Sequence, residues 1–144
     1  IEYVHDEAEK NLPLMAGVRE ILTYFHERGI RIATASSSSV AQIEKNLTQS
    51  GLRNYFDAIV GGDLVAHGKP APDIFLMAAA RIGIPAEECY VFEDGYNGLR
   101  GAAAAGCAPI MIPDTMPPTD EMRALCAGIY PSLLAVMDAI QKDK

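Results

Sequence analysis

The chain has 144 residues, the length of one ordinary domain, with 49% hydrophobic and 22% charged residues. This composition is typical of a folded globular protein and excludes a disordered one. The formal net charge of −7 argues against nucleic acid or an anionic membrane as the main partner, because both attract basic surfaces.

The three cysteines, Cys89, Cys107 and Cys126, lie far apart in apolar segments and match no zinc or disulfide pattern. We therefore expect reduced thiols in a cytoplasmic protein. The longest apolar stretch, around residues 101–112, is too short and too rich in glycine to span a bilayer. No signal peptide is visible.

The first predicted helix covers residues 16–28, where apolar residues recur every three or four positions and Gly29 follows as a terminator. A buried strand over residues 30–35 comes next, and then a helix with Ser39 and Gln42 as its capping box. The remaining predicted elements are strands over residues 58–61, 89–92 and 109–112, helices over 72–82 and 97–105, and two short C-terminal helices.

Strands alternate with helices along the chain, which predicts an α/β fold with a parallel sheet and helices on both faces. In such a sheet the carboxyl ends of the strands share one edge, where ligands bind. Three polar clusters follow predicted strands and should meet there: Thr34–Ser39, Gly68–Asp73 and Phe92–Gly98.

The first two clusters suit a phosphate. The hydroxyl of Ser36, with Ser37 beside it, can bind a phosphoryl oxygen near the backbone N–H groups that begin the next helix. Taken alone, a polar turn with Ser39 as a helix cap explains these serines better. Lys69 precedes Pro70, which favours an extended backbone and a defined direction for its charge. The alternative for Lys69 is a solvated loop lysine.

Glu93 and Asp94 are the most specific signal. Consecutive carboxylates at the end of a buried strand repel each other and lose hydration, so a bound cation would offset that cost. Mg²⁺ suits them because it prefers hard oxygen ligands and usually takes one or two protein carboxylates. The alternative is that the two acids only cap the next helix.

In this order, the residues resemble the second, third and fourth motifs of the haloacid dehalogenase (HAD) superfamily, in its β-phosphoglucomutase-like phosphatase branch. The resemblance implies a Rossmann-like core in which Ser36 and Ser37 bind phosphate, Lys69 neutralises charge, and Glu93 and Asp94 bind Mg²⁺. It also implies a Mg²⁺-dependent phosphatase for a small phosphorylated metabolite such as a sugar phosphate. Catalysis would proceed through an aspartyl-phosphate.

The sequence departs from the family in one respect: it contains no Asp-x-Asp, the first motif, and Asp6 is followed two positions later by Ala8. We therefore expect the nucleophile to lie upstream of this chain, and this chain alone to be inactive. Residues 1–11 would be a remnant of the cap domain, and residues 12–144 the C-terminal part of the core. Its sheet would lack the first, central strand, which the upstream segment or another chain would complete.

Two alternatives stay open. One is a phosphomutase of the same family, although the segment Ser36–Ser39 offers no basic residue for a second phosphate, which mildly favours hydrolysis. The other is a non-catalytic module that binds phosphate or a protein partner, if the chain is complete as written.

Overall fold

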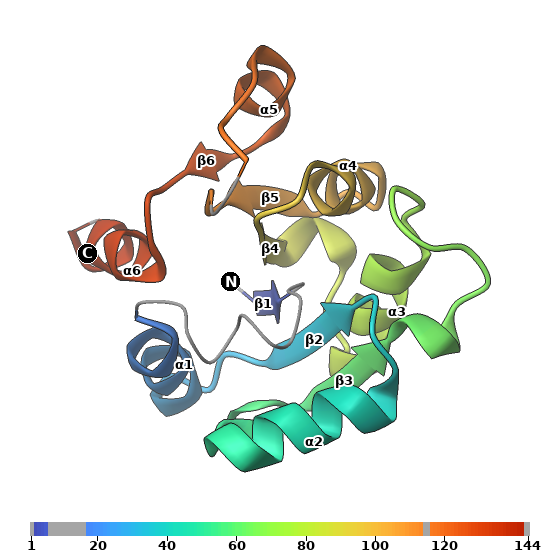
Figure 1. The fold of residues 1–144 in the computed structure, drawn as a ribbon. Helices are drawn as coiled ribbons and strands as arrows, with labels where there is room; N and C mark the ends of the chain where they lie inside the picture. Colours follow the sequence, from blue (N-terminus) through green and yellow to red (C-terminus); the bar gives the residue numbers. More distant parts are fainter. Residues whose placement is uncertain (1, 6–16, 114–115, 143–144) are drawn as a thin grey trace.

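The computed structural model describes residues 2–5, 17–113 and 116–142, and within them a six-stranded parallel sheet forms the middle of the molecule (Figure 1). The strand order is β3-β2-β1-β4-β5-β6, and every neighbouring pair is parallel. The strands are β1 (Glu2–His5), β2 (Ile32–Ser36), β3 (Ala58–Gly61), β4 (Cys89–Glu93), β5 (Ala108–Met111) and β6 (Gly128–Ile129).

Helices cover both faces of the sheet (Figure 1). One face carries α1 (Val18–Glu27), α2 (Val40–Ser50) and α6 (Leu133–Lys142), and the other carries α3 (Asp73–Ile82) and α4 (Tyr96–Ala104). The short helix α5 (Asp120–Leu125) lies beyond the sheet and packs on α4 through Met122 and Leu99. The predicted α/β class is therefore confirmed.

Strands β2 to β5 are mostly apolar because both of their faces are largely buried. In β2, Ile32 packs in the core under α1, whereas Ala33 and Ala35 pack in the core under α3. In β4, Phe92 packs in the same core as Ile32, and Val91 packs in the same core as Ala33 and Ala35. Successive residues of a strand point to opposite faces, so one run of apolar residues serves both layers.

The predicted helix ends agree with the structure to within two residues. The Ser39 hydroxyl accepts a hydrogen bond from the Gln42 backbone N–H at 3.2 Å, as a cap does. The reciprocal hydrogen bond of a capping box, from the Gln42 side chain back to Ser39, is not formed. The Gln42 side chain donates to Asn46 Oδ1 instead, at 3.0 Å. Gly51, with φ of 75°, ends α2 in the left-handed conformation that glycine adopts readily.

The centre of the sheet differs from the expectation. The sheet was expected to lack its central strand, but Glu2–His5 form β1 between β2 and β4. The physical reason is that two buried parallel strands leave backbone groups that need partners, and Tyr3 and Val4 favour extended structure. No second chain is needed at this position. Residues 1 and 6–11, the rest of the expected cap remnant, lie outside the described residues, so the domain division stays a prediction.

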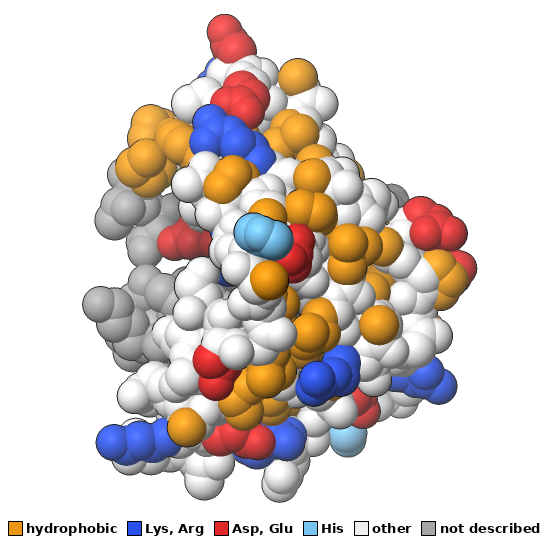
Figure 2. All heavy atoms as spheres, turned by 90° about the vertical axis from the view of Figure 1, so that its right-hand side faces the viewer, with side chains coloured by type: hydrophobic (Ala, Val, Ile, Leu, Met, Phe, Trp, Pro, Cys, Tyr) orange, Lys and Arg blue, Asp and Glu red, His pale blue; other side chains and the backbone are white. Residues whose placement is uncertain are grey.

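Among the residues that the structure describes, the exposed large hydrophobic side chains are Leu64, Leu76, Met116 and Leu134. Figure 2 shows the face on the right of Figure 1, where hydrophobic side chains lie between acidic, basic and histidine side chains. Leu64 and Leu76 are exposed by 38% and 47%, which is ordinary for single surface residues. Within the described part of the chain, no helix has the length and apolar character needed to cross a membrane.

Candidate active site

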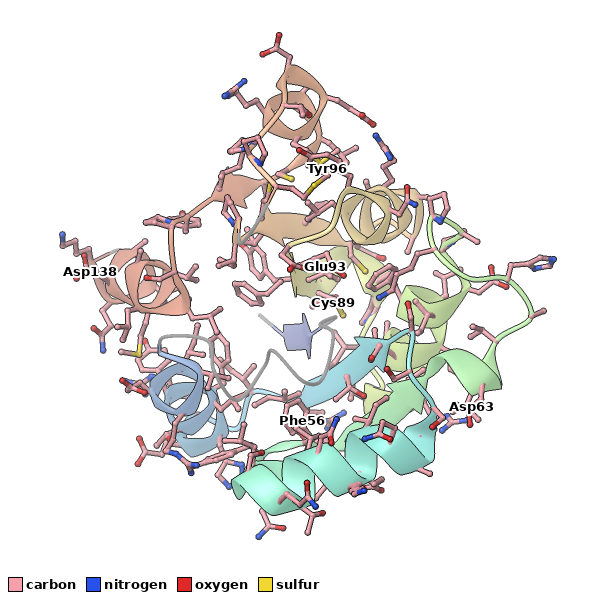
Figure 3. All side chains as sticks on the ribbon, in the orientation of Figure 1. Phe56, Asp63, Cys89, Glu93, Tyr96 and Asp138 are labelled. Carbon is pink, nitrogen blue, oxygen red and sulfur yellow. The ribbon has the colours of Figure 1, made fainter. Side chains whose placement is uncertain are left out.

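A cavity of about 480 Å³ opens at the carboxyl ends of β2 and β4. Its wall includes Ser36 and Ser37 after β2, Lys69 from the loop between β3 and α3, and Glu93 and Asp94 at the end of β4. Figure 3 labels Glu93 at this end of β4. The five predicted site residues therefore meet in one place, and the cavity has the size of a small-molecule site.

Ser36 is the last residue of β2 and is 3% exposed. Its Oγ accepts a hydrogen bond from the Ser38 backbone N–H at 3.2 Å, which keeps the hydroxyl at the mouth of the turn. A serine hydroxyl can act both as a donor and as an acceptor of hydrogen bonds. Ser37 is exposed on the same turn. This geometry suits an anion bound at the turn.

The serine turn is held by the segment after β3. Gly62 donates its N–H to the Ser38 carbonyl at 2.7 Å, and a Cβ on Gly62 would lie only 2.3 Å from the Ser37 carbonyl oxygen. Asp63 Oδ1 accepts the Val40 N–H at 3.1 Å, at the start of α2. The sequence signal for this support is Gly61-Gly62-Asp63, which begins at the last residue of β3.

Lys69 is largely buried and paired. Its side chain is 13% exposed, its Nζ lies 3.6 Å from Glu93 Oε2, and the same atom lies 5.7 Å from the centre of the Phe75 ring. Burial lowers the pKa of Lys69, and the charges of Glu93 and Asp94 partly oppose that change. A solvated loop lysine does not fit this environment.

Glu93 has both carboxylate oxygens occupied. Oε1 accepts the backbone N–H groups of Asp94 at 2.9 Å and Gly95 at 3.0 Å, and Oε2 faces Lys69. A Cβ on Gly98 would lie 2.1 Å from Oε2, so α4 can approach this carboxylate only where it has no side chain. Glu93 thus orders the turn before α4, as the capping alternative expected, and also holds the lysine.

The donor set fits Mg²⁺. Asp94 is half-buried and lines the cavity next to Glu93, and both provide the hard oxygen ligands that Mg²⁺ prefers. The described residues contain no group of three or more His, Cys, Asp or Glu side chains that could hold a metal. Mg²⁺ usually keeps waters and substrate oxygens as its other ligands, so two carboxylates suffice. Asp94 is the more accessible of the two.

Sequence reasoning missed the outer wall of the cavity, which is formed by Tyr96, Asn97, Arg100 and Met116. Asn97 and Arg100 are three residues apart on α4, and this spacing places two side chains on one face of a helix. The Tyr96 hydroxyl donates to the Pro117 carbonyl, and Tyr96 is labelled in Figure 3. The helical spacing was a signal that could have identified this pair.

The carboxyl end of β1 also reaches this edge. His5 is in register with Thr34 of β2 and with Phe92 of β4. Strand β1 therefore ends between the two strands that carry Ser36 and Glu93. Asp6, the next residue, lies outside the described residues.

Comparison with known proteins gives a consistent result. Residues 2–106 match the model of a hydrolase family described as haloacid dehalogenase-like hydrolase. The chain is 44% identical over 95 residues to fructose-1-phosphate phosphatase YqaB of Escherichia coli (strain K12), covering 66% of this chain and 48% of that protein. It is 35% identical over 131 residues to hexitol phosphatase B of Escherichia coli O157:H7, covering 91% of this chain and 59% of that protein.

Solved structures agree with these matches. A mutant of CbbY from Rhodobacter sphaeroides, in complex with xylulose-(1,5)bisphosphate, has a TM-score of 0.73 and 32% identity, covering 82% of this chain and 53% of that one. A putative β-phosphoglucomutase from Thermotoga maritima has a TM-score of 0.79 and 27% identity, covering 88% and 59%. The chain thus spans about half to three fifths of the length of these four proteins.

Proposed function

This chain belongs to the haloacid dehalogenase-like hydrolase family, and on that premise we propose that it provides most of the core of a Mg²⁺-dependent phosphatase. The substrate is a small phosphorylated metabolite such as a sugar phosphate. The observation that carries the proposal is the buried Lys69–Glu93 pair, which lines one cavity with Ser36 and Asp94. Relatives named as phosphatases of fructose 1-phosphate and of hexitol phosphates support the substrate class.

Each site residue has a role in this proposal. Ser36 donates its hydroxyl proton to a phosphoryl oxygen, and Ser37 binds a second oxygen from the same turn. Lys69 offsets the negative charge that gathers when a carboxylate approaches the phosphate. Glu93 and Asp94 would hold Mg²⁺, which when bound reduces the repulsion between these anions.

The nucleophile is proposed to be an aspartate of an Asp-x-Asp segment upstream of this chain, since the 144 residues contain no such motif. Its carboxylate oxygen forms a bond to phosphorus while the bond from phosphorus to the metabolite oxygen breaks. Water then hydrolyses the aspartyl-phosphate and releases inorganic phosphate. Residues 12–144 would be the C-terminal part of the core, Glu2–His5 would belong to that core as its central strand and not to a cap, and this chain alone would be inactive.

Binding and turnover test the proposal separately. In titration calorimetry, the chain should bind inorganic phosphate more tightly with Mg²⁺ than without it. Ser36→Ala and Lys69→Met should each weaken phosphate binding at least about tenfold, because a charge-assisted hydrogen bond contributes about 1.5–3 kcal/mol. Lys45→Met, at an exposed lysine of α2, is the matched control and should leave binding unchanged.

Turnover decides the role of the missing motif. The chain alone should release no phosphate from a sugar phosphate, whereas a protein that joins it to an Asp-x-Asp segment should. Release by the chain alone would contradict the upstream nucleophile, and absence of phosphate binding would contradict the proposed site. A phosphomutase would instead convert a sugar phosphate into its isomer, which phosphorus NMR distinguishes from free phosphate.

A non-catalytic phosphate-binding module is the second candidate. It is favoured by one observation: the 144 residues contain no Asp-x-Asp motif. This candidate predicts the same phosphate binding but no turnover with or without an added Asp-x-Asp segment.

A further inference from the structure

The outer wall of the cavity contains a second cation, Arg100 of α4, that the proposed phosphate chemistry does not use. Ser36, Lys69 and Asp94 serve the phosphate at the strand ends. A cavity of about 480 Å³ is much larger than one phosphate group, so the rest of the metabolite has room beside α4. Arg100 is therefore placed to contact the part of the metabolite that leaves.

The guanidinium of Arg100 is only partly engaged. Its Nε and Nη2 donate to the two carboxylate oxygens of Glu121 at 2.8 and 2.7 Å, and its Nη1 donates to Asn97 Oδ1 at 2.9 Å. A guanidinium has five N–H groups, of which two are on Nη1 and two on Nη2. Among the residues that the structure describes, one N–H on each of these two nitrogens has no acceptor. Such a pair of N–H groups matches the oxygens of a phosphate or a carboxylate.

Glu121 orients this arginine from outside the cavity. It belongs to α5, which packs on α4 through Met122 and Leu99, and Glu121 itself does not line the cavity. The side chains of Arg100 and Glu121 are 40% and 51% exposed. An ion pair this exposed is strongly screened by water, so the arginine keeps its capacity to attract another anion. Because the guanidinium is already fixed, an anion that binds it loses less entropy.

We propose that Arg100 is a specificity-determining residue that binds a second anionic group, a phosphate or a carboxylate, on the leaving part of the metabolite. This inference rests on the proposed phosphatase function and narrows its substrate class. It also bears on the missing basic residue near Ser36–Ser39: the serine turn has none, whereas α4 supplies one that lines the same cavity.

Two probe pairs test the inference by titration calorimetry with Mg²⁺ present. Each pair differs by one anionic group: fructose 1-phosphate against fructose 1,6-bisphosphate, and glucose 6-phosphate against 6-phosphogluconate. The chain should bind the more anionic member of at least one pair about tenfold more tightly, a difference of about 1.4 kcal/mol. The pair that shows the preference identifies the anion as a phosphate or a carboxylate.

Arg100→Gln should abolish the preference and change monophosphate affinity by less than about twofold, because Arg100 contacts only the second anion. Arg100→Lys keeps the charge without the paired N–H groups and should retain only part of the preference. The matched control is Arg123→Gln on α5, where Arg123 pairs with Asp120 at 2.9 Å and does not line the cavity. It should keep the full preference.

The outcomes separate this inference from the function on which it rests. Monophosphate binding without a preference in either pair would overturn the role of Arg100 and leave the phosphate site standing. Equal weakening of all four probes by Arg100→Gln would also overturn it, since the residue would then act on the site as a whole. If the unaltered chain binds neither inorganic phosphate nor any probe, both proposals fail.

Discussion

Nζ of Lys69 lies 3.6 Å from Oε2 of Glu93, and the two side chains are only 13% and 6% exposed. Burying both charges costs desolvation energy that their attraction does not reliably recover. The pair is therefore poor evidence for a contribution to stability. It is better evidence for a binding site in which charged groups are already in place before the ligand arrives. A cation and a carboxylate kept together in this way can rearrange around an incoming phosphate without large movements.

The first prediction concerns stability at high pH. Burial lowers the pKa of Lys69 in the folded protein below its ordinary value of 10.5. Between the lowered value and 10.5, the unfolded chain binds more protons at this residue, so raising the pH favours folding there. The free energy of unfolding of the unaltered chain, minus that of Lys69→Met, should thus increase as the pH rises towards 10.5. Urea unfolding at several pH values measures this difference in free energy. A decrease of the difference with rising pH would contradict the lowered pKa of Lys69.

The second prediction separates the two acids. Glu93→Gln should lower the free energy of unfolding by about 3 kcal/mol or more, because it removes the carboxylate that lies nearest to the largely buried charge of Lys69. Asp94→Asn should lower that free energy by less than Glu93→Gln does, since Asp94 is less buried than Glu93. It should nevertheless weaken Mg²⁺ binding at least about tenfold, as the loss of a metal ligand does. Unchanged Mg²⁺ affinity in Asp94→Asn would remove this residue from the metal site.

The third prediction concerns Gly98. An added methyl group would lie 2.1 Å from Glu93 Oε2, and this carboxylate is fixed by two backbone N–H groups on its other oxygen. Gly98→Ala should therefore destabilise the fold by about 1–3 kcal/mol, despite the better helix propensity of alanine. Gly68→Ala is the control, because nothing lies within 4 Å of its added methyl group. Equal thermal melting of both variants would show that Glu93 moves freely.

The fourth prediction concerns the thiols. Burial raises the pKa of Cys107 to about 12 and also raises the pKa of Cys126, while Cys89 is buried in the same core as Cys107. A thiol reagent at pH 8 should thus modify Cys126, the least buried, at least about tenfold faster than the other two. Cys126→Ser should remove the fast phase. Rapid labelling of all three thiols in the folded protein would show that the core opens readily.

The raised pKa of Cys107 also predicts a loss of stability above pH 9. The folded protein holds the Cys107 proton between 9.0 and about 12, where the unfolded chain releases it, so this stabilising contribution falls as the pH rises through that window. Cys107→Ala should lose less stability over that interval in urea unfolding. This trend has the opposite sign to that of Lys69, so the two variants are best compared separately.

The fold was predictable from the sequence wherever the local residue preferences and the pattern of buried residues indicate the same element. Gly51 and Gly83 end their helices at φ of 75° and 72°, and Ser39 caps α2, because these requirements are local. The five site residues also converge as expected, because strand order and the carboxyl edge follow from a parallel α/β sheet.

Other features depend on distant parts of the chain and have no local signal. Glu2–His5 contain polar residues that also suit a helix, and the weak preference of Tyr3 and Val4 for extended structure becomes decisive only between the edges of β2 and β4. Strand β6 has two residues, too few to produce a pattern. Arg100 lines the cavity because α4 starts directly after the acidic turn and because α5 packs beside α4.

The position of β1 has a consequence for how the protein folds. Tyr3 pairs with Ile32 on one side and with Tyr90 on the other, so the central strand joins segments that are far apart in the chain. Contacts over such separations form slowly, because the loop entropy is lost before the pairing energy is gained. Within the described residues, β1 is the strand through which the β2–β3 half of the sheet is hydrogen-bonded to the β4–β5–β6 half. We expect the two halves to assemble first, and the cavity between Ser36 and Glu93 to form only when they join.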